Sequence, residues 1–187
     1  IGGGGLLVHY DNLNEKTIDV SVSINIKNEE KKKSALVELR LQDNKGLDVF
    51  TNKQNIVLES NKSTNYISNF KIFNPKLWTP DNPQLHDLHV TIKSTNGELL
   101  DKFKKRIGLR TIEMRGDDGF YLNGKSYPEL LIGGNRHQDF AHIGHALPNN
   151  LHYRDALKLR QSGMRVIRSA HYCLLYTSDA ADEVQCV

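Results

Sequence analysis

Strict alternation of apolar and polar residues over positions 17–28 constrains the fold of this chain more than any other feature. The apolar positions are Ile18, Val20, Val22, Ile24 and Ile26. A period of two gives a strand one face for a core and another face for water. Residues 35–41 repeat the pattern, and the turn-forming residues 43–46 follow them. This part of the chain is therefore predicted to form half-buried strands.

Further apolar runs extend the strand pattern along the chain. They lie at 56–58, 66–73, 88–92 and 99–107, and Asn96-Gly97 supplies a hairpin turn before the last run. About seven short strands with regularly spaced turns and no helical period are typical of an immunoglobulin-like β-sandwich. We assign this domain to residues 1–114, where nothing has the pattern of a catalytic site.

Trp78 lies in a segment, 77–85, that also holds two of the five prolines. The favoured interpretation is a rigid crossover between strands in which Trp78 fills one end of the sandwich. The alternative is a sugar-stacking platform, because an exposed indole can cover a sugar ring. A single Trp beside prolines gives that alternative little support.

The second part of the chain changes from strand to helix and back. Residues 129–133 are a short apolar run, as expected of a strand buried on both faces, and residues 164–169 are another. A helix between such strands requires a parallel crossover. We therefore predict the truncated start of a (β/α)8 TIM barrel, with its first βαβ unit at 129–172. Residues 115–128 are assigned to a linker and a small hairpin.

Spacing within the helical segment predicts its ends and one of its faces. Asn149 or Asn150 can cap its start, and Gly163 can end it. One face carries Tyr153, Ala156, Leu157 and Arg160 at intervals of three and four residues.

Polar residues follow both predicted strands of this unit. The carboxyl ends of parallel strands share one rim of a barrel, and barrel active sites form at that rim. An Arg there can hold a carboxylate through two hydrogen bonds, and imidazoles can donate to sugar hydroxyls. The alternative is a buried polar network that only braces the structure. The first group is Asn135, Arg136, His137 and Asp139, and the second is Arg168 and His171.

Histidines concentrate between positions 137 and 171, which raises the hypothesis of a metal site. Its ligands would be His137, His142 and His145. Their spacing matches no helix-borne ligand pattern and carboxylate partners are sparse, so an exposed loop is preferred for His142 and His145. We assign no cofactor, and a divalent or monovalent metal ion in a longer parent protein stays open.

Composition excludes several classes of protein. The net charge of +3 comes from basic residues spread along the chain, so we expect no nucleic-acid partner. No apolar run reaches about 18 residues, so we expect no membrane span. The chain starts without Met and without a signal-peptide pattern, and we interpret it as part of a longer protein whose compartment, periplasmic or cytoplasmic, stays open.

Five short motifs resemble glycoside hydrolase family 2, the family of β-galactosidases, β-glucuronidases and β-mannosidases. The resemblance is strongest in Asn-Arg-His-Gln-Asp and in the segment ending Arg-Ser-Ala-His-Tyr. It covers an immunoglobulin-like domain and the opening of a (β/α)8 barrel. Ile132-Gly133-Gly134 departs from it, because members more often have Arg-Gly-Val or Arg-Gly-Ala there. The motifs lie at 78–83, 108–113, 120–125, 135–139 and 163–172.

The resemblance implies a retaining β-glycosidase that uses two glutamates, both on later strands than this chain contains. A β-galactosidase-like enzyme acting on a β-linked oligosaccharide or glycoside is the first expectation, and the chain alone is expected to be inactive. Whether the parent is a homo-oligomer stays open. The implied roles are substrate binding for His137, His171 and Asn135, orientation of the nucleophile for Arg168, and support for Arg136 and Asp139.

Residues 173–187 match the translation of an adapter used in sequencing libraries. The resemblance is broken at Cys173, where the family has Pro, and both cysteines of the chain fall in this tail. We hypothesise that the tail is not native. A long genomic read that encodes it within an open gene would contradict this.

Two other functions remain as alternatives. Residues 1–112 alone would permit a non-catalytic β-sandwich, either structural or carbohydrate-binding. A metal-dependent barrel hydrolase is the other, testable by metal analysis of the parent. Polar groups after two successive strands favour the glycosidase over both.

Overall fold

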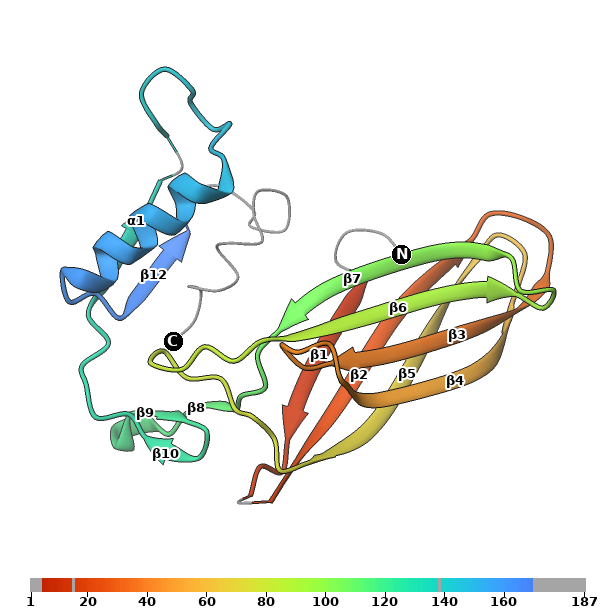
Figure 1. Ribbon diagram of the computed structural model, residues 1–187, viewed down its shortest axis with the longest axis horizontal. Coiled ribbons are helices and arrows are strands. Elements are labelled where there is room, and N and C mark those ends of the chain that lie inside the picture. The colour runs from red at the N-terminus through yellow and green to blue at the C-terminus, as the bar shows by residue number, and fades with distance from the viewer. Residues whose placement is uncertain (1–4, 15, 138, 170–187) are drawn as a thin grey trace. The chain divides into compact units, whose positions relative to one another are not determined.

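The computed structural model describes residues 5–14, 16–137 and 139–169. They form two compact units. Of these residues, the first unit contains those up to Trp78 together with Gln84–Thr111, and the second contains Thr79–Pro83 and those from Ile112 to Ser169. Strands build the first unit, and the second holds helix α1 (Asn149–Gln161) (Figure 1). No helix within the described ranges is long and apolar enough to cross a membrane.

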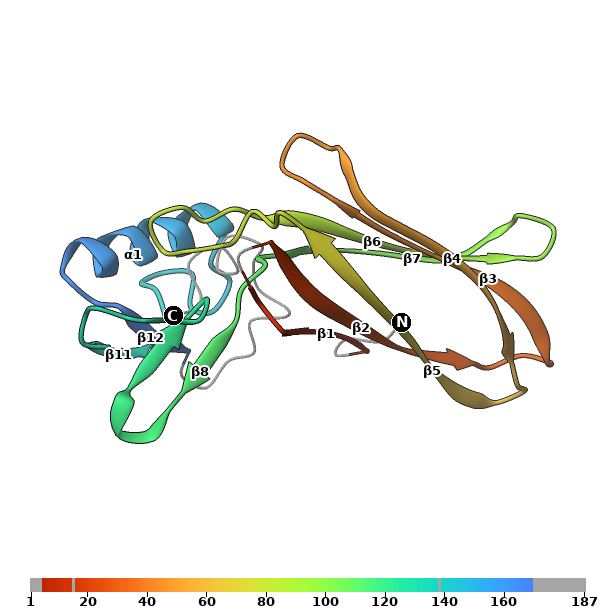
Figure 2. The same ribbon diagram turned by 90° about the horizontal axis from the view of Figure 1, so that it is seen from below.

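The first unit is the predicted β-sandwich. One sheet has the order β1-β2-β5 and the other the order β4-β3-β6-β7, with every neighbouring pair antiparallel. Figure 2 shows the two sheets as separate layers. Only β1 falls outside the predicted apolar runs. The strands are β1 (Leu6–Asp11), β2 (Thr17–Asn28), β3 (Lys33–Gln42), β4 (Asp48–Leu58), β5 (Lys62–Phe73), β6 (His86–Ser94) and β7 (Leu99–Ile107).

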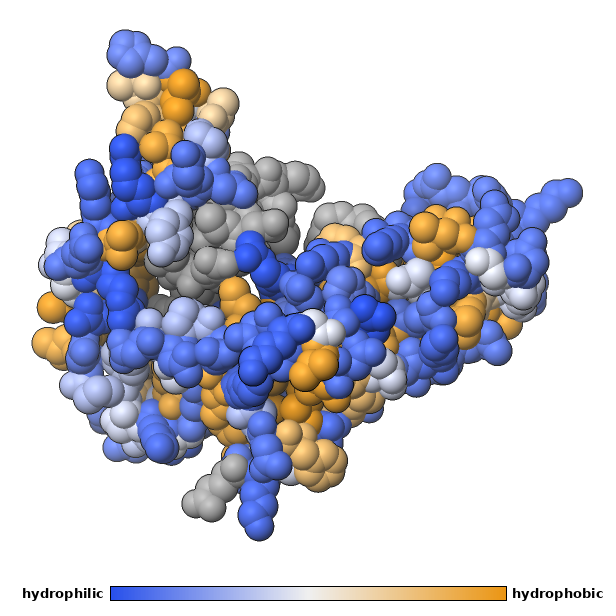
Figure 3. All heavy atoms as spheres, in the orientation of Figure 1, coloured by the Kyte–Doolittle hydropathy of each residue, from blue (hydrophilic) through white to orange (hydrophobic). Residues whose placement is uncertain are grey.

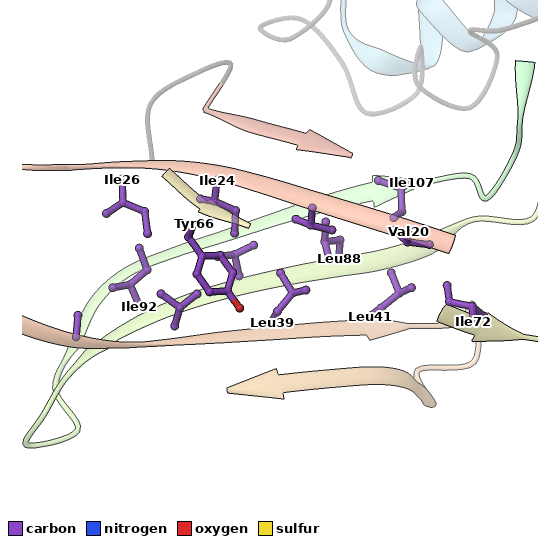
Figure 4. Packing of buried hydrophobic residues seen from close by; sticks show 14 of the residues in the cluster. Val20, Ile24, Ile26, Leu39, Leu41, Tyr66, Ile72, Leu88, Ile92 and Ile107 are labelled. Carbon is purple, nitrogen blue, oxygen red and sulfur yellow. The ribbon is translucent and has the colours of Figure 1, made fainter. Parts of the chain in front are cut away.

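The core lies between these sheets and follows from the alternation in sequence. In β2 the apolar residues from Ile18 to Ile24 are at most 1% exposed, and their polar neighbours reach the outer face. Figure 4 shows Val20, Ile24 and Ile26 pointing toward Leu39 and other residues of the facing sheet. Full burial of each such side chain contributes about 1.5–3 kcal/mol. The sandwich therefore has a continuous apolar core.

Trp78 is a packing residue of the sandwich. It is 2% exposed, and its backbone N–H donates to the carbonyl oxygen of Leu109 at 2.9 Å. The guanidinium of Arg110 lies 4.6 Å from the centre of the indole. A Cβ on Gly108 would lie 2.8 Å from Trp78 Cγ, so only glycine fits against this ring. The crossover interpretation of Trp78 is confirmed, and the sugar-platform alternative is wrong because the ring is buried.

The second unit begins with a small antiparallel sheet of order β10-β9-β8. Its strands are β8 (Ile112–Met114), β9 (Phe120–Leu122) and β10 (Lys125–Ser126), and the short helix η1 (Gly116–Asp118) joins the first two. The turn between β9 and β10 has positive φ at both Asn123 and Gly124, which is the geometry that an Asn-Gly pair favours in a two-residue hairpin turn.

A βαβ unit follows, and its strands are parallel. Strand β11 (Gly133–Arg136) pairs with β12 (Val166–Ser169), and α1 lies between them in sequence. In Figures 1 and 2, α1 covers one face of this strand pair. The topology confirms the predicted crossover.

The first of these strands lies later in the sequence than predicted. The apolar run at 129–133 is mostly outside it, and Leu130 and Ile132 are 80% and 60% exposed. The apolar character of these residues had predicted a buried strand. Pairing instead depends on the register with β12, where the backbone at Gly133 comes so close to Val166 that a Cβ would lie 1.9 Å from its carbonyl oxygen.

Helix α1 ends as predicted but differs in its start and its buried face. Gly163 has φ of +92°, and the N–H groups of Gly163 and Met164 donate to Arg160 and Leu159, which is a Schellman motif. The residue before the helix is Pro148, and no side chain caps it. The buried residues are His152 and Ala156, whereas Tyr153 and Leu157 are 49% and 43% exposed. Of the four residues on the predicted face, only Ala156 is buried.

Candidate functional site

Two predicted site residues, Asn135 and Arg168, lie side by side on adjacent parallel strands. They are register partners, and an Arg168 Nη approaches the side-chain oxygen of Asn135 at 3.5 Å. Both side chains are exposed. This arrangement presents a cation and an amide on one face of the sheet edge, with hydrogen-bonding capacity left for a ligand.

Arg136 points to the opposite face of β11, toward α1, because side chains alternate along a strand. Its Nη2 donates to Oδ2 of Asp155 at 2.8 Å, and only 13% of the Arg136 side chain is exposed. The other Asp155 oxygen lies 3.5 Å from Arg154. Arg136 therefore joins the strand to the helix, and the supporting role assigned to it stays a prediction.

His137 and Asp139 lie in the loop that follows β11, and both are exposed. The Asp139 carboxylate contacts Nε2 of His145 within this loop. A bridge between Phe140 and Gly144 closes the loop, and the Arg154 guanidinium lies 5.3 Å from the centre of the Phe140 ring. Contacts within the loop and with α1 thus fix part of its course after His137.

The remaining predicted site residue, His171, lies outside the described residues, as does the tail at 173–187. Its role stays a prediction from the sequence. Of the predicted sugar-binding edge, the structure describes Asn135, His137 and Arg168.

The hypothetical metal site gains no support in the described part of the chain. His142 and His145 are exposed, as is His137. No group of three or more His, Cys, Asp or Glu side chains among the described residues is arranged to hold a metal ion.

His152 is the buried histidine of this region, at 3% exposed. Burial lowers the pKa of its imidazole, the positive charge of Arg136 lowers the pKa further, and the carboxylate of Asp155 opposes both. Neither ring nitrogen has a hydrogen-bond partner in the described structure. A neutral imidazole is therefore packed beside the Arg136–Asp155 pair, in surroundings with little access to water.

Carboxylates near this sheet edge are already engaged by basic side chains. Asp155 binds Arg136 and Asp139 contacts His145, whereas Glu129, which contacts Arg165, precedes β11 and lies toward the other end of the strands. A general acid or nucleophile needs a carboxyl group within reach of the substrate. The described edge can therefore position a ligand through Asn135, His137 and Arg168, and it offers no evident pair of carboxylates for acid–base chemistry.

Sequence reasoning missed Asp155 as part of this region. A signal was available, because a partly buried Arg needs a carboxylate partner. The partner of Arg136 lies 19 residues further along the chain, on the helix rather than in the neighbouring loop. Only the packing of α1 on the strand pair brings the two together.

Two family profiles match the chain. That of glycosyl hydrolases family 2 matches residues 6–110, and that of the TIM barrel domain of the same family matches residues 112–178. The chain belongs to glycosyl hydrolases family 2. The β-sandwich is thus the family's sandwich domain, and β11, α1 and β12 are the start of its TIM barrel domain. The second match ends within the segment predicted to be non-native.

Relatives in this family carry the names of two activities. The chain is 31% identical over 169 residues to a β-galactosidase of Thermoanaerobacter pseudethanolicus, covering 87% of this chain and 21% of that protein. It is 33% identical over 159 residues to a putative β-glucuronidase of Formosa agariphila, covering 85% and 18%. The chain spans about a fifth of the length of these curated relatives.

Solved structures of the family agree with the fold. The crystal structure of a Bacteroides uniformis β-glucuronidase superposes with a TM-score of 0.80 at 30% identity, covering 98% of this chain and 22% of that one. Its similarity extends over both the sandwich and the described start of the barrel domain.

Proposed function

We propose that this chain is part of a retaining exo-β-glycosidase that hydrolyses O-glycosidic bonds, with a β-galactosidase-like specificity. The observation that carries the proposal is the pairing of Asn135 with Arg168 at the ends of two parallel strands. Barrel enzymes bind substrate at that end of their strands. The names of the relatives, β-galactosidase and β-glucuronidase, support a β-glycoside as substrate.

In this proposal the described residues form one edge of a sugar pocket. Asn135 and His137 hydrogen-bond sugar hydroxyls, together with His171, and Arg168 orients the carboxylate that attacks the anomeric carbon. A guanidinium suits that task because it can hold both oxygens of a carboxylate. Arg136 and Asp139 hold the first strand end and its loop.

The chain alone is proposed to be inactive. In a retaining glycosidase one carboxyl group protonates the leaving oxygen and another attacks, and the two lie about 5–5.5 Å apart. We infer from the family resemblance that both glutamates lie on barrel strands after β12. The acidic residues found near the sheet edge, Asp155 and Asp139, are engaged by Arg136 and His145 instead.

Assay of the parent gene product on aryl β-glycosides tests the proposal. We expect release of the aryl alcohol, fastest from the β-galactoside, and formation of the β-configured sugar as the first product. Preference for the β-glucuronide would reject the β-galactosidase-like specificity and keep the reaction class. No hydrolysis of any β-glycoside would reject the glycosidase.

A non-catalytic, carbohydrate-binding sandwich is the second candidate, and one feature favours it. A hollow of about 450 Å³ lies on the sheet β1-β2-β5 and is lined in part by His9, Asp19, Asn69 and Lys71. Such side chains can donate and accept hydrogen bonds with sugar hydroxyls. Titration of the chain with oligosaccharides, followed by NMR shifts of these residues, would separate this candidate from the glycosidase.

A further inference from the structure

Side chains alternate along β11, so its two polar residues point to opposite faces of the sheet. Asn135 faces the side on which Arg168 lies, and Arg136 faces α1. His137 follows directly after the strand. The direction of the strand end therefore decides where Asn135 and His137 present their polar groups.

Besides its pairing with β12, this strand end has a contact with the helix. Asp155 accepts a hydrogen bond from Arg136 at 2.8 Å, and the two side chains are 25% and 13% exposed. The neighbouring His152 is buried. Because the pair is largely shielded, removal of one partner takes an opposite charge away from the other in poorly solvated surroundings, which is more costly than removal of both.

We propose that Asp155 is a positioning residue of the glycosidase, acting through Arg136 to fix the end of β11 that carries Asn135 and His137. The inference rests on the proposed function. Asp155 touches no reacting group itself. Without its carboxylate, the guanidinium of Arg136 turns toward water or toward another acid, and the strand end moves with it. Misplacement of binding groups by about 1 Å can lower a rate on the order of 10²-fold.

The test uses the parent polypeptide and the conservative variant Asp155→Asn. We expect kcat and kcat/KM on an aryl β-glycoside to fall together on the order of 10²-fold, because the positioned groups act in the transition state. Asp155→Glu keeps the charge and is expected to recover most of the loss. The control is Asp117→Asn, which neutralises an exposed aspartate in η1 and is expected to change kcat/KM less than about twofold.

A double variant separates positioning from simple stability. Arg136→Met with Asp155→Leu replaces both charges by apolar groups, so thermal stability is expected to return to near the wild-type value. Activity per active site, counted from the burst of aryl alcohol, is expected to stay low because the strand end has lost its directional contact.

The outcomes are distinct. Wild-type-like kcat in Asp155→Asn, or in the double variant, overturns the role of Asp155 while the proposed function stands. A wild-type parent that hydrolyses no β-glycoside rejects the proposed function and this role with it.

Discussion

At the scale of single residues, Trp78 and Gly108 show how two of the motifs that resemble the family serve packing rather than chemistry. The indole lies against the backbone of Gly108, and Arg110 stacks on it. Trp78 is buried beside the sandwich core, so its place in the motif is explained by its volume.

We predict that Gly108→Ala destabilises the sandwich. The added methyl group would meet Trp78 Cγ at 2.8 Å, and a buried ring has little room to move. Overpacking of this kind costs about 1–3 kcal/mol of unfolding free energy. Urea unfolding followed by Trp78 fluorescence measures it. Lys102→Ala, at an exposed site on β7, should change stability by less than about 0.5 kcal/mol, and an equal effect of both variants would contradict the clash.

A second residue-scale prediction concerns pH and His86, which is 3% exposed. Burial lowers the pKa of its imidazole, the carboxylate of Asp43 opposes this, and the ammonium of Lys76 adds to it. The unfolded chain therefore takes up the proton first as pH falls. Stability from this group is present above about pH 6.5 and is lost as pH drops toward the lower folded pKa.

Urea unfolding at pH 7.5 and 5.5 tests this prediction. His86→Gln is expected to reduce the difference in unfolding free energy between the two pH values, whatever its effect at a single pH. Burial also lowers the pKa of His89. This histidine should account for part of the pH dependence that remains. An unchanged difference would show that His86 titrates alike in the folded and unfolded states.

At the scale of elements, β11 shows what decides the position of a strand in a parallel pair. Its two glycines are adjacent in sequence but differ in surroundings. A Cβ at Gly133 would lie 1.9 Å from the Val166 carbonyl oxygen, whereas a Cβ at Gly134 would meet only the end of Met164 at 3.9 Å. The first glycine allows close approach of two backbones, and the second has room for a side chain.

We predict that Gly133→Ala destabilises the barrel domain of the parent and that Gly134→Ala, the matched control, does not. The first change forces the strands apart, at a cost of about 1–3 kcal/mol or more. The second adds a methyl group in ordinary contact with a flexible side chain. Thermal unfolding of the parent measures both, and equal unfolding temperatures for the two variants would refute the pairing of Gly133 with Val166.

The sequence predicted the existence of these elements better than their limits. The two apolar runs, the helical spacing and Gly163 indicated a βαβ unit, and the unit is present. Strand β11 includes the polar residues Asn135 and Arg136, whereas the hydropathy pattern ended the predicted strand before them. Hydropathy reports burial, but strand pairing needs backbone contact with a partner that is remote in sequence.

At the scale of the whole molecule, the two units differ in how well their apolar residues are covered. The sandwich encloses a core of residues such as Ile18 and Leu39 at 0–1% exposure. In the second unit Leu130 and Ile132 are mostly exposed, and Tyr153 and Leu157 lie open on α1. On the face drawn in Figure 3, hydrophobic residues also reach the surface of the unit that carries α1.

We predict that the sandwich is well ordered in the isolated chain and that the βαβ unit is poorly ordered or prone to aggregate. Exposed apolar faces contribute little to stability, so local opening should be frequent there. Hydrogen exchange measures this, and amides of β2 should be protected on the order of 10²-fold or more relative to those of residues 130–136. Equal protection of both segments in a monomer would contradict the prediction.

The sequence by itself determined the sandwich, because alternation at period two places five residues of β2 in one core whatever their partners are. It also indicated the polar residues at the carboxyl ends of the barrel strands. Only the tertiary structure decided that Asn135 meets Arg168 while Arg136 turns back to Asp155 on α1. Those contacts join residues 33 and 19 positions apart, and they depend on strand register and helix packing, which local pattern does not fix.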